Sequence, residues 1–377
     1  MPLIAKENYP MTSVGILTRH CYPNYGSLLQ AFALESAFSS LGAKTKVIDY
    51  VPPSDTPYQL TTSSLRESRM RGSPVKKMLY YAIQGPNLFR MASRFRKYQI
   101  ASLNLSETVS DRDGISAVAG RFDAVVTGSD QIWNKIHDAI DPNYYLAGVE
   151  GAVKKYSYAA SFGSVGPSEE DVDRVLKWLK SFQSISVREP SALTELTALG
   201  ERRTRRDVDP VLLHNRHFWM SYAADEFPAH GPYILVYQLH NTPRFDERLR
   251  QLRVRHNLPV RRVTADGKQR LRYNATDYLV SPKQFVRLFR DASVVLTDSF
   301  HGTAFSLAFG RPVYSLLPAK HATRCKDLLC DVGLPHLAVS ANEDLPRDPA
   351  YDAEEAYVSL ANQAEVSWRY LRTIVEQ

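Results

Sequence analysis

The sequence predicts an α/β protein with two Rossmann-like β/α domains that face a shared cleft. Short apolar runs rich in β-branched residues alternate with helix-like segments along most of the chain, as in parallel sheets covered by helices. Several of these runs end in small and polar residues, where such sheets bind ligands. The length of 377 residues exceeds what one hydrophobic core usually holds, so two domains are expected.

The composition excludes several classes of protein. Lys and Arg number 47 against 40 Asp and Glu, and the net charge of +7 favours anionic ligands or an anionic membrane face but is too small to indicate nucleic-acid binding. The three cysteines, an odd number without a CxxC pair, indicate neither a disulfide framework nor a zinc site. Neither a signal peptide nor a run of about 20 apolar residues is present, so we expect a cytoplasmic protein that could still work at the inner face of the membrane.

The first half of the chain contains strand-like runs separated by helices. Strands are predicted at 14–17, 46–50, 122–127, 155–160 and 184–187. Helices are predicted at 27–41, 169–182 and 190–199. The first turn lacks GxGxxG, so a dinucleotide fingerprint is absent. Its Asn24 and Gly26 either cradle a polar ligand at the helix start or form a plain turn.

The stretch 53–110 is polar, basic and rich in aromatic residues, which suggests amphipathic helices outside the sheet. Nucleic-acid binding and contact with an anionic or lipid-linked substrate are two interpretations. A solvated helical face is the third, and composition favours it.

The strand predicted at 122–127 leads into a dense polar turn. Gly128 and Ser129 offer backbone donors, and the side chains of Asp130, Gln131 and Asn134 can bond a sugar or a phosphate. Trp133 either stacks on a sugar or fills the core. We interpret this turn as part of a binding site.

Arg188 follows another predicted strand, where a fixed guanidinium can hold a phosphate or carboxylate at two points. The alternative is a salt bridge to Glu189 or to another neighbour. Further on, Asp209-Pro210 and the turn-prone residues after it resemble a linker, which divides the chain into domains 1–210 and 211–377.

The second half repeats the alternation. Strands are predicted at 233–238, 260–264, 294–297 and 313–317. Helices are predicted at 244–256, 282–291, 300–309 and 320–331, the last with Arg324 as a candidate anion ligand. A long helix at 352–375 is expected to pack back across both domains.

His301 is the main catalytic candidate. It lies in the first turn of the helix predicted at 300–309, where free N–H groups and the helix dipole attract anions. Gly302 lets a ligand approach the backbone closely, and Asp298, Ser299 and Thr303 add polar groups. The alternative is that His301 only caps or packs, but its polar surroundings favour a functional role.

The pattern resembles the GT-B-like form of sugar-modifying transferases, and the motifs resemble the polysaccharide pyruvyl transferase family. The resemblance covers most of the chain. The motifs are N-Y-G-S-L-L-Q-A at 24–31, G-S-D-Q-I-W-N at 128–134, S-V-R-E-P-S-A at 186–192, D-P-V-L-L at 209–213, T-D-S-F-H-G-T-A-F-S-L-A-F-G-R-P at 297–312, and Arg324 before D-L-L.

The resemblance implies transfer of pyruvate from phosphoenolpyruvate to a sugar, usually as a cyclic ketal. The family's acid/base histidine falls on His301, and its anion-binding arginines fall on Arg188 and Arg324. Tyr25 belongs to the N-Y-G motif and is included among the binding candidates. Asp298 could orient His301. No metal or other cofactor is expected.

The resemblance leaves the acceptor open. The stretches 53–110 and 265–280 match no family motif, so we expect acceptor specificity there, with the N-terminal domain as the acceptor side. A lipid-linked acceptor and peripheral membrane contact would suit the basic, aromatic residues at 66–98. Two alternative functions are a GT-B-type glycosyltransferase that uses a nucleotide sugar and a non-catalytic binding protein.

Overall fold

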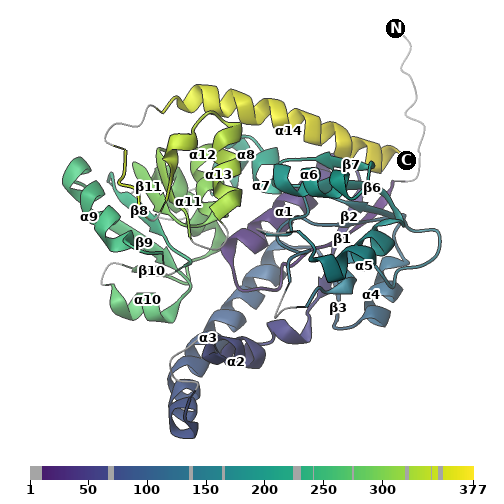
Figure 1. Ribbon diagram of the computed structural model, residues 1–377, viewed down its shortest axis with the longest axis horizontal. Helices are drawn as coiled ribbons and strands as arrows, with labels where there is room; N and C mark the ends of the chain where they lie inside the picture. The colour runs from purple at the N-terminus through teal and green to yellow at the C-terminus, as the bar shows by residue number, and fades with distance from the viewer. Residues whose placement is uncertain are drawn as a thin grey trace.

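The computed structural model describes residues 11–66, 72–135, 139–163, 166–223, 231–240, 242–273, 276–318, 322–340, 342–346 and 351–377. These residues form two parallel sheets that lie side by side, with helices packed around them (Figure 1). The C-terminal helix runs along one side of both sheets, and a long helix projects away from the opposite side. The predicted α/β fold with two Rossmann-like units is therefore confirmed.

The first sheet has the strand order β3-β2-β1-β4-β5-β6-β7. Its strands are β1 Ser13–Leu17, β2 Lys44–Tyr50, β3 Leu105–Val109, β4 Ala124–Thr127, β5 Lys154–Ser157, β6 Phe182–Val187 and β7 Thr204–Arg206. Val14 of the central β1 pairs with Thr45 on one side and with Ala124 on the other. Because the strands are parallel, their carboxyl ends share one edge of the sheet, where ligands bind in this class of fold.

The second sheet has the order β10-β9-β8-β11-β12-β13. Its strands are β8 Ile234–Tyr237, β9 Val260–Thr264, β10 Thr276–Tyr278, β11 Val294–Thr297, β12 Val313–Leu316 and β13 Ala338–Val339. The central strands β8 and β11 are buried along their whole length, as continuous apolar runs in helix-covered parallel sheets are.

The helices connect the strands and cover the sheets. Their bounds are α1 Tyr25–Ser40, α2 Pro57–Arg66, α3 Pro74–Ser102, α4 Arg112–Ala119, α5 Glu169–Leu179, α6 Pro190–Ala198, α7 Pro210–Leu213, α8 Arg216–Tyr222, α9 Phe245–His256, α10 Gly267–Arg272, α11 Pro282–Asp291, α12 Phe300–Ala308, α13 Ala322–Asp331 and α14 Ala353–Glu376, with 3₁₀ turns η1 Pro53–Asp55, η2 Pro142–Tyr145 and η3 Pro335–Leu337. None of the helices in the described ranges is both long and apolar enough to cross a bilayer.

The structure corrects the prediction at the edges of both sheets. Residues 105–109 were placed outside the sheet but form its edge strand β3, and no strand was predicted at the other edge strands, β7, β10 and β13. These strands are short and contain at most one buried residue, so the apolar run that reveals an inner strand is absent. The predicted start of helix 320–331 lies outside the described residues, which begin again at Ala322.

The predicted linker is a buried helical turn. All four residues of α7 are buried, and α7 contacts α1, α12 and α14. Asp209 caps it by accepting a hydrogen bond from the Val211 N–H at 3.0 Å, with Pro210 at its first position. The strands of the two sheets fall on either side of residue 210, but the domain boundary itself stays a prediction.

Helix α14 ties the C-terminus to both halves of the molecule. Its first half packs in the core of the second sheet through Ala356 and Leu360. Its second half packs against the first sheet, where the Tyr370 hydroxyl donates to the Ser157 carbonyl at 3.0 Å. The helix therefore crosses the junction between the two sheets, as Figure 1 shows.

Candidate active site

Helices from different parts of the chain begin around His301. The imidazole belongs to the first turn of α12, Gly26 to the first turn of α1, and Asp209 caps α7. His301 is 6% exposed, and its Nε2 lies 3.6 Å from Asp209 Oδ2, an ion-pair separation that is too long for a hydrogen bond. Nε2 has no hydrogen-bond partner among the described residues, although it is buried.

Gly26 leaves room for the imidazole. A Cβ added at Gly26 would lie 2.1 Å from His301 Nδ1 and 2.4 Å from its Cγ. Both residues are held in capped helix turns, so a methyl group there has to displace the ring. The glycine of the N-Y-G motif, in the first half of the chain, therefore leaves the space that the His301 ring from the second half occupies.

We expect Gly26→Ala to impair the site more than the fold. Alanine suits a helix, so the cost falls on the position of His301, and a displacement of about 1 Å can lower turnover by roughly 100-fold. Activity and the thermal midpoint should be measured beside Gly85→Ala, whose added Cβ meets nothing within 4 Å. Equal activity in the two variants would contradict the contact.

Arg188 is held by carboxylates. Its Nη1 donates to Asp209 at 2.8 Å, its Nε donates to Glu189 at 2.9 Å, and Asp130 lies 3.9 Å away. Burial alone would lower the pKa of Arg188, but these carboxylates outweigh it and raise the pKa. For Asp209 burial acts in the other direction and would raise the pKa, but His301 and Arg188 bring the pKa of Asp209 well below its usual range. The predicted salt bridge between Arg188 and Glu189 is therefore confirmed. Binding of an anion stays a prediction, for which the buried Nη2 has no other hydrogen-bond partner among the described residues.

Arg324 is the contrasting cation. It is 7% exposed, and no carboxylate of the described residues lies within ion-pair distance of it. With the Gln131 amide oxygen turned towards it, that oxygen accepts from Nη1 at 2.7 Å and from Nη2 at 3.0 Å. Burial and the nearby charge of Arg188 lower the pKa of Arg324, and its Nε has no partner. A buried guanidinium with a neutral partner is a ready ligand for an anion.

Phe300 brings the two guanidiniums together. Its ring centre lies 4.2 Å from Cζ of Arg188 and 6.0 Å from Cζ of Arg324. The pocket lined by these three residues and Asp209 has a volume of about 20 Å³, enough for roughly one water molecule. The structure therefore brings His301, Arg188 and Arg324 into one cluster, with little free volume between the two arginines.

Other candidates on α12 stabilise the turn. Ser299 caps the helix, with its Oγ accepting from the Gly302 N–H at 3.3 Å. The space beside Gly302 is filled by Thr297, whose Oγ1 would lie 2.3 Å from an added Cβ, and not by room for a ligand. The Thr303 hydroxyl bonds the Ser299 carbonyl at 3.1 Å and Ser315 at 2.9 Å.

Asp298 lies in a different place from the one expected for a residue that orients His301. Its carboxylate accepts from the N–H of Leu239 at 2.6 Å, from the N–H of His240 at 3.1 Å and from the Thr242 hydroxyl at 2.7 Å. Burial raises the pKa of Asp298 to about 6 against these bonds. The carboxylate that faces the imidazole is Asp209, so Asp298 instead fixes the loop after β8.

The polar turn after β4 divides between the site and the core. Asp130 accepts from the Ser27 hydroxyl at 2.7 Å, and burial, which would raise its pKa, is outweighed by His301 and Arg188, which lower it. Trp133 belongs to the core, stacked on Tyr145 at 5.1 Å. The remaining predicted residues support the turn: Gly128 packs on the Tyr158 carbonyl, Ser129 bonds the Ala159 carbonyl at 2.8 Å, and the side-chain amides of Asn134 and Gln131 lie 3.1 Å apart.

A cavity of about 730 Å³ lies next to the cluster, between α3 and the carboxyl ends of β8 and β9. Asn24 and Tyr25 line it, directly before the glycine that touches His301. Asn24 also caps α1, and the Tyr25 hydroxyl bonds the Val280 carbonyl at 2.9 Å. Its remaining wall comes largely from the two stretches that match no family motif, with Ser64, Gln84, Asn87, Leu88 and Met91 on one side and residues 265–269, Arg272 and Tyr273 on the other.

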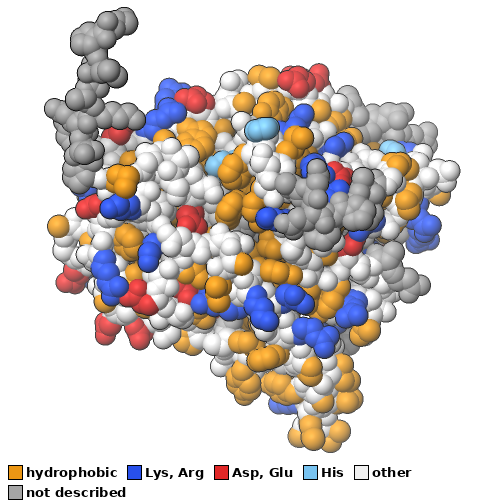
Figure 2. Space-filling model, turned by 180° about the vertical axis from the view of Figure 1, so that it is seen from behind, with side chains coloured by type: hydrophobic (Ala, Val, Ile, Leu, Met, Phe, Trp, Pro, Cys, Tyr) orange, Lys and Arg blue, Asp and Glu red, His pale blue; other side chains and the backbone are white. Residues whose placement is uncertain are grey.

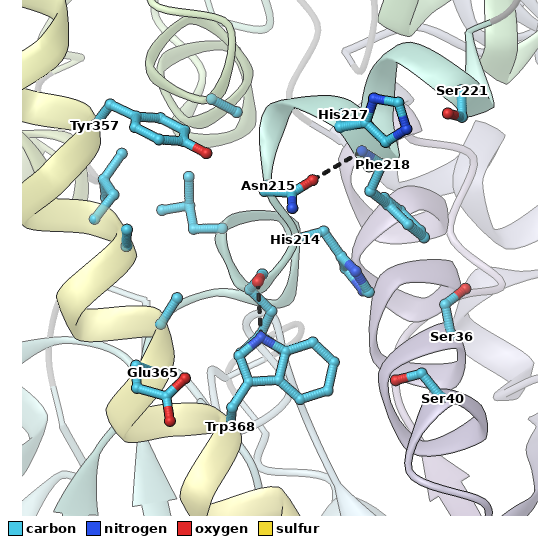
Figure 3. Close-up of a pocket in the computed structure, with 16 residues that line it drawn as sticks. Ser36, Ser40, His214, Asn215, His217, Phe218, Ser221, Tyr357, Glu365 and Trp368 are labelled. Carbon is cyan, nitrogen blue, oxygen red and sulfur yellow. Dashed lines mark hydrogen bonds between the residues drawn. The ribbon is translucent and has the colours of Figure 1, made fainter.

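A further cavity of about 620 Å³ lies between α1, α8 and α14 (Figure 3). His214 stacks on Phe218 there at 3.8 Å, and burial lowers the pKa of His214 to about 4. Trp368 closes the cavity, with its Nε1 donating to the Leu213 carbonyl at 2.9 Å. None of the predicted site residues lines this cavity.

Asp209 and Phe300 were not predicted as parts of the cluster. Asp209 was taken for a linker, although Asp before Pro is also the start signal of a helix. Phe300 lies in the helix predicted at 300–309, and nothing in its spacing shows that two arginines would pack against its ring. Glu189 was foreseen as a partner for Arg188 and has that place.

Comparisons with known proteins come from three directions. The family model "Polysaccharide pyruvyl transferase" matches residues 24–318. A search of curated proteins gave no significant match. Among solved structures, UDP-N-acetylglucosamine 2-epimerase from Rickettsia bellii aligns with a TM-score of 0.55 at 11% identity, over 97% of this chain and 96% of that one. The same enzyme from Neisseria meningitidis aligns with a TM-score of 0.50 at 9% identity, over 97% and 100%. At such identities the likeness shows the GT-B fold alone.

Proposed function

Because the chain belongs to the polysaccharide pyruvyl transferase family, we propose that it transfers pyruvate from phosphoenolpyruvate to a sugar of a cell-surface polysaccharide or its lipid-linked precursor, in the cytoplasm. The observation that carries the choice of donor is the cluster of His301, Arg188 and Arg324. A small dianionic donor matches two buried guanidiniums, one of them without a carboxylate partner.

The arginines have separate tasks in this proposal. Arg324 binds the phosphate or the carboxylate of the donor, because no carboxylate of the described residues lies within ion-pair distance of it. Arg188 is fixed by Asp209 and Glu189 and offers Nη2 as a second hydrogen-bond donor. The pocket beside the two arginines has a volume of about 20 Å³, so side chains around it have to move when phosphoenolpyruvate binds there.

The chemistry needs a proton relay at this position. The methylene carbon of phosphoenolpyruvate gains a proton, and one sugar hydroxyl adds to the central carbon while losing its own. Phosphate then leaves, and a second hydroxyl closes the ketal and gives up its proton. In this proposal His301 carries these protons as the acid/base, and such a group typically contributes about 10²–10⁴-fold. Asp209 holds the imidazole electrostatically from 3.6 Å.

The acceptor is assigned to the cavity between α3 and the second sheet. Gln84, Asn87 and Gln269 offer hydrogen-bonding groups that suit hydroxyls, and Lys268 and Arg272 suit a phosphate on the acceptor. Gly26, which follows the Asn24-Tyr25 wall of this cavity, touches His301. A sugar bound there would approach the imidazole along the start of α1.

A thermal-shift panel separates this proposal from a nucleotide-sugar glycosyltransferase. We expect phosphoenolpyruvate to raise the thermal midpoint, and ligand at about 100 times its dissociation constant stabilises by about 2.7 kcal/mol. Pyruvate and inorganic phosphate, each carrying part of the donor, should stabilise less. A shift with nucleoside diphosphates and none with phosphoenolpyruvate would support the glycosyltransferase instead.

A further inference from the structure

Helix α3 presents an unusual apolar face to solvent. Val75, Met78 and Phe89 are 76%, 78% and 64% exposed, and Leu79 and Ile83 are about half exposed. With Ala82 and Pro86, which are also exposed, these residues occupy positions i, i+3, i+4, i+7, i+8, i+11 and i+14. That spacing places them on one side of the helix, and we call these seven residues the α3 face. Figure 2 shows the projection at the bottom of the molecule as mainly hydrophobic.

The opposite side of the same helix faces the protein. Gln84, Asn87, Leu88 and Met91 line the large cavity, and the Tyr80 hydroxyl bonds Ser64 of α2. The α3 face is therefore not the side by which the helix packs. A helix that keeps polar groups inward and apolar groups outward is arranged for an apolar environment outside the protein.

The charges that helix α3 carries are of one sign. Helix α3 has no Asp or Glu, and its cations are Lys76, Lys77, Arg90, Arg94, Arg96 and Lys97. Arg96 pairs with Asp49, whereas the other five are exposed. A second copy of this chain would bring two such cationic helices together, which like-charge repulsion opposes. An anionic bilayer supplies both an apolar phase and negative headgroups.

We propose that the α3 face lies in the surface of an anionic membrane, with Lys76 and Arg90, which flank this face on the helix, at the headgroups. The cavity behind α3 then adjoins the bilayer, where the sugar of a lipid-linked acceptor would lie. This last step rests on the proposed function, whereas the docking itself depends only on the helix.

Sedimentation with vesicles tests the docking. The full chain should sediment with vesicles of phosphatidylcholine and phosphatidylglycerol and much less with phosphatidylcholine alone. The triple variant Val75→Ser, Met78→Ser, Phe89→Ser should lose at least about tenfold in affinity. The matched control is Met220→Ser, Val254→Ser, Val358→Ser, which removes three exposed apolar side chains from α8, α9 and α14 and should leave affinity unchanged.

The cations are tested separately. Lys76→Gln with Arg90→Gln should weaken binding to the anionic vesicles by roughly 25-fold, since each cation near the surface contributes about fivefold. No sedimentation of the parent chain, or equal losses in the α3 triple and its control, would overturn the proposal. So would a dimer in light scattering that the α3 triple converts to a monomer, because the face would then bind a second copy.

Activity separates this proposal from the proposed function. The α3 triple should turn over a water-soluble acceptor normally and a vesicle-bound, lipid-linked acceptor poorly. Equal turnover of the vesicle-bound acceptor by the parent chain and the α3 triple would contradict the claim that docking of α3 brings the cavity to a lipid-linked acceptor. Vesicle binding without any phosphate release from phosphoenolpyruvate would reject the function and leave the docking in place.

Discussion

Replacing His301 with Asn is expected to reduce pyruvyl transfer by about 10²–10⁴-fold, the usual cost of losing a general acid/base. The fold should persist, because Asp209 keeps its 2.8 Å ion pair with Arg188 and the buried carboxylate stays neutralised. Phosphate release from phosphoenolpyruvate measures the first outcome, and the thermal midpoint measures the second.

The control for this variant is His217→Asn. His217 is exposed on α8, so this variant makes the same substitution outside the cluster. The activity of His217→Asn should therefore match that of the parent protein. This control also shows whether the loss of any histidine affects activity in general. Unchanged turnover in His301→Asn would reject the acid/base role assigned to this residue.

Replacing the two arginines is expected to move stability in opposite directions. Arg324→Gln removes a buried cation that has no carboxylate partner in the described residues, so the free energy of unfolding should hold or rise by an amount on the order of 1 kcal/mol. Arg188→Gln leaves the carboxylates of Asp209 and Glu189 buried without their cation and should cost roughly 3–5 kcal/mol.

Donor affinity distinguishes this pattern from a merely structural one. Arg324→Gln should weaken phosphoenolpyruvate binding by roughly ten- to 150-fold, since a hydrogen bond to a charged group contributes about 1.5–3 kcal/mol. If Arg324→Gln makes the protein more stable but weakens binding of the donor, the charge of Arg324 serves binding and not the stability of the fold. Denaturant unfolding and calorimetry on the same samples measure both quantities. If Arg324→Gln destabilised the fold as strongly as Arg188→Gln, the cation would be structural.

The sequence predicted the sheets because central strands such as β8 and β11 are continuous apolar runs. These two strands are buried throughout and were located within a residue or two. The edge strands β3, β7, β10 and β13 were missed because an edge strand is held by one neighbour and needs few apolar side chains.

The sequence predicted which residues belong to the candidate site better than it predicted the contacts between them. Local signals placed His301, Arg188 and Arg324 at strand or helix ends, and the fold brings them around Asp209 and Phe300. The pairing of Gly26 with His301 joins residues from opposite halves of the chain, which no local pattern encodes. For Trp133 the sequence could not decide between two roles, because an aromatic residue in a polar turn can stack on a sugar or pack in the core; the structure places it in the core.

The central claim is that an imidazole and two buried guanidiniums form one site for a small dianionic donor. Phosphate release from phosphoenolpyruvate tests it most directly, with galactosyl, glucosyl and N-acetylmannosaminyl acceptors supplied in turn. We expect release that depends on at least one of these acceptors, with the acceptor gaining a pyruvate ketal in its mass spectrum. Pyruvate left unattached after phosphate has been released, or no release with any acceptor, would contradict the account.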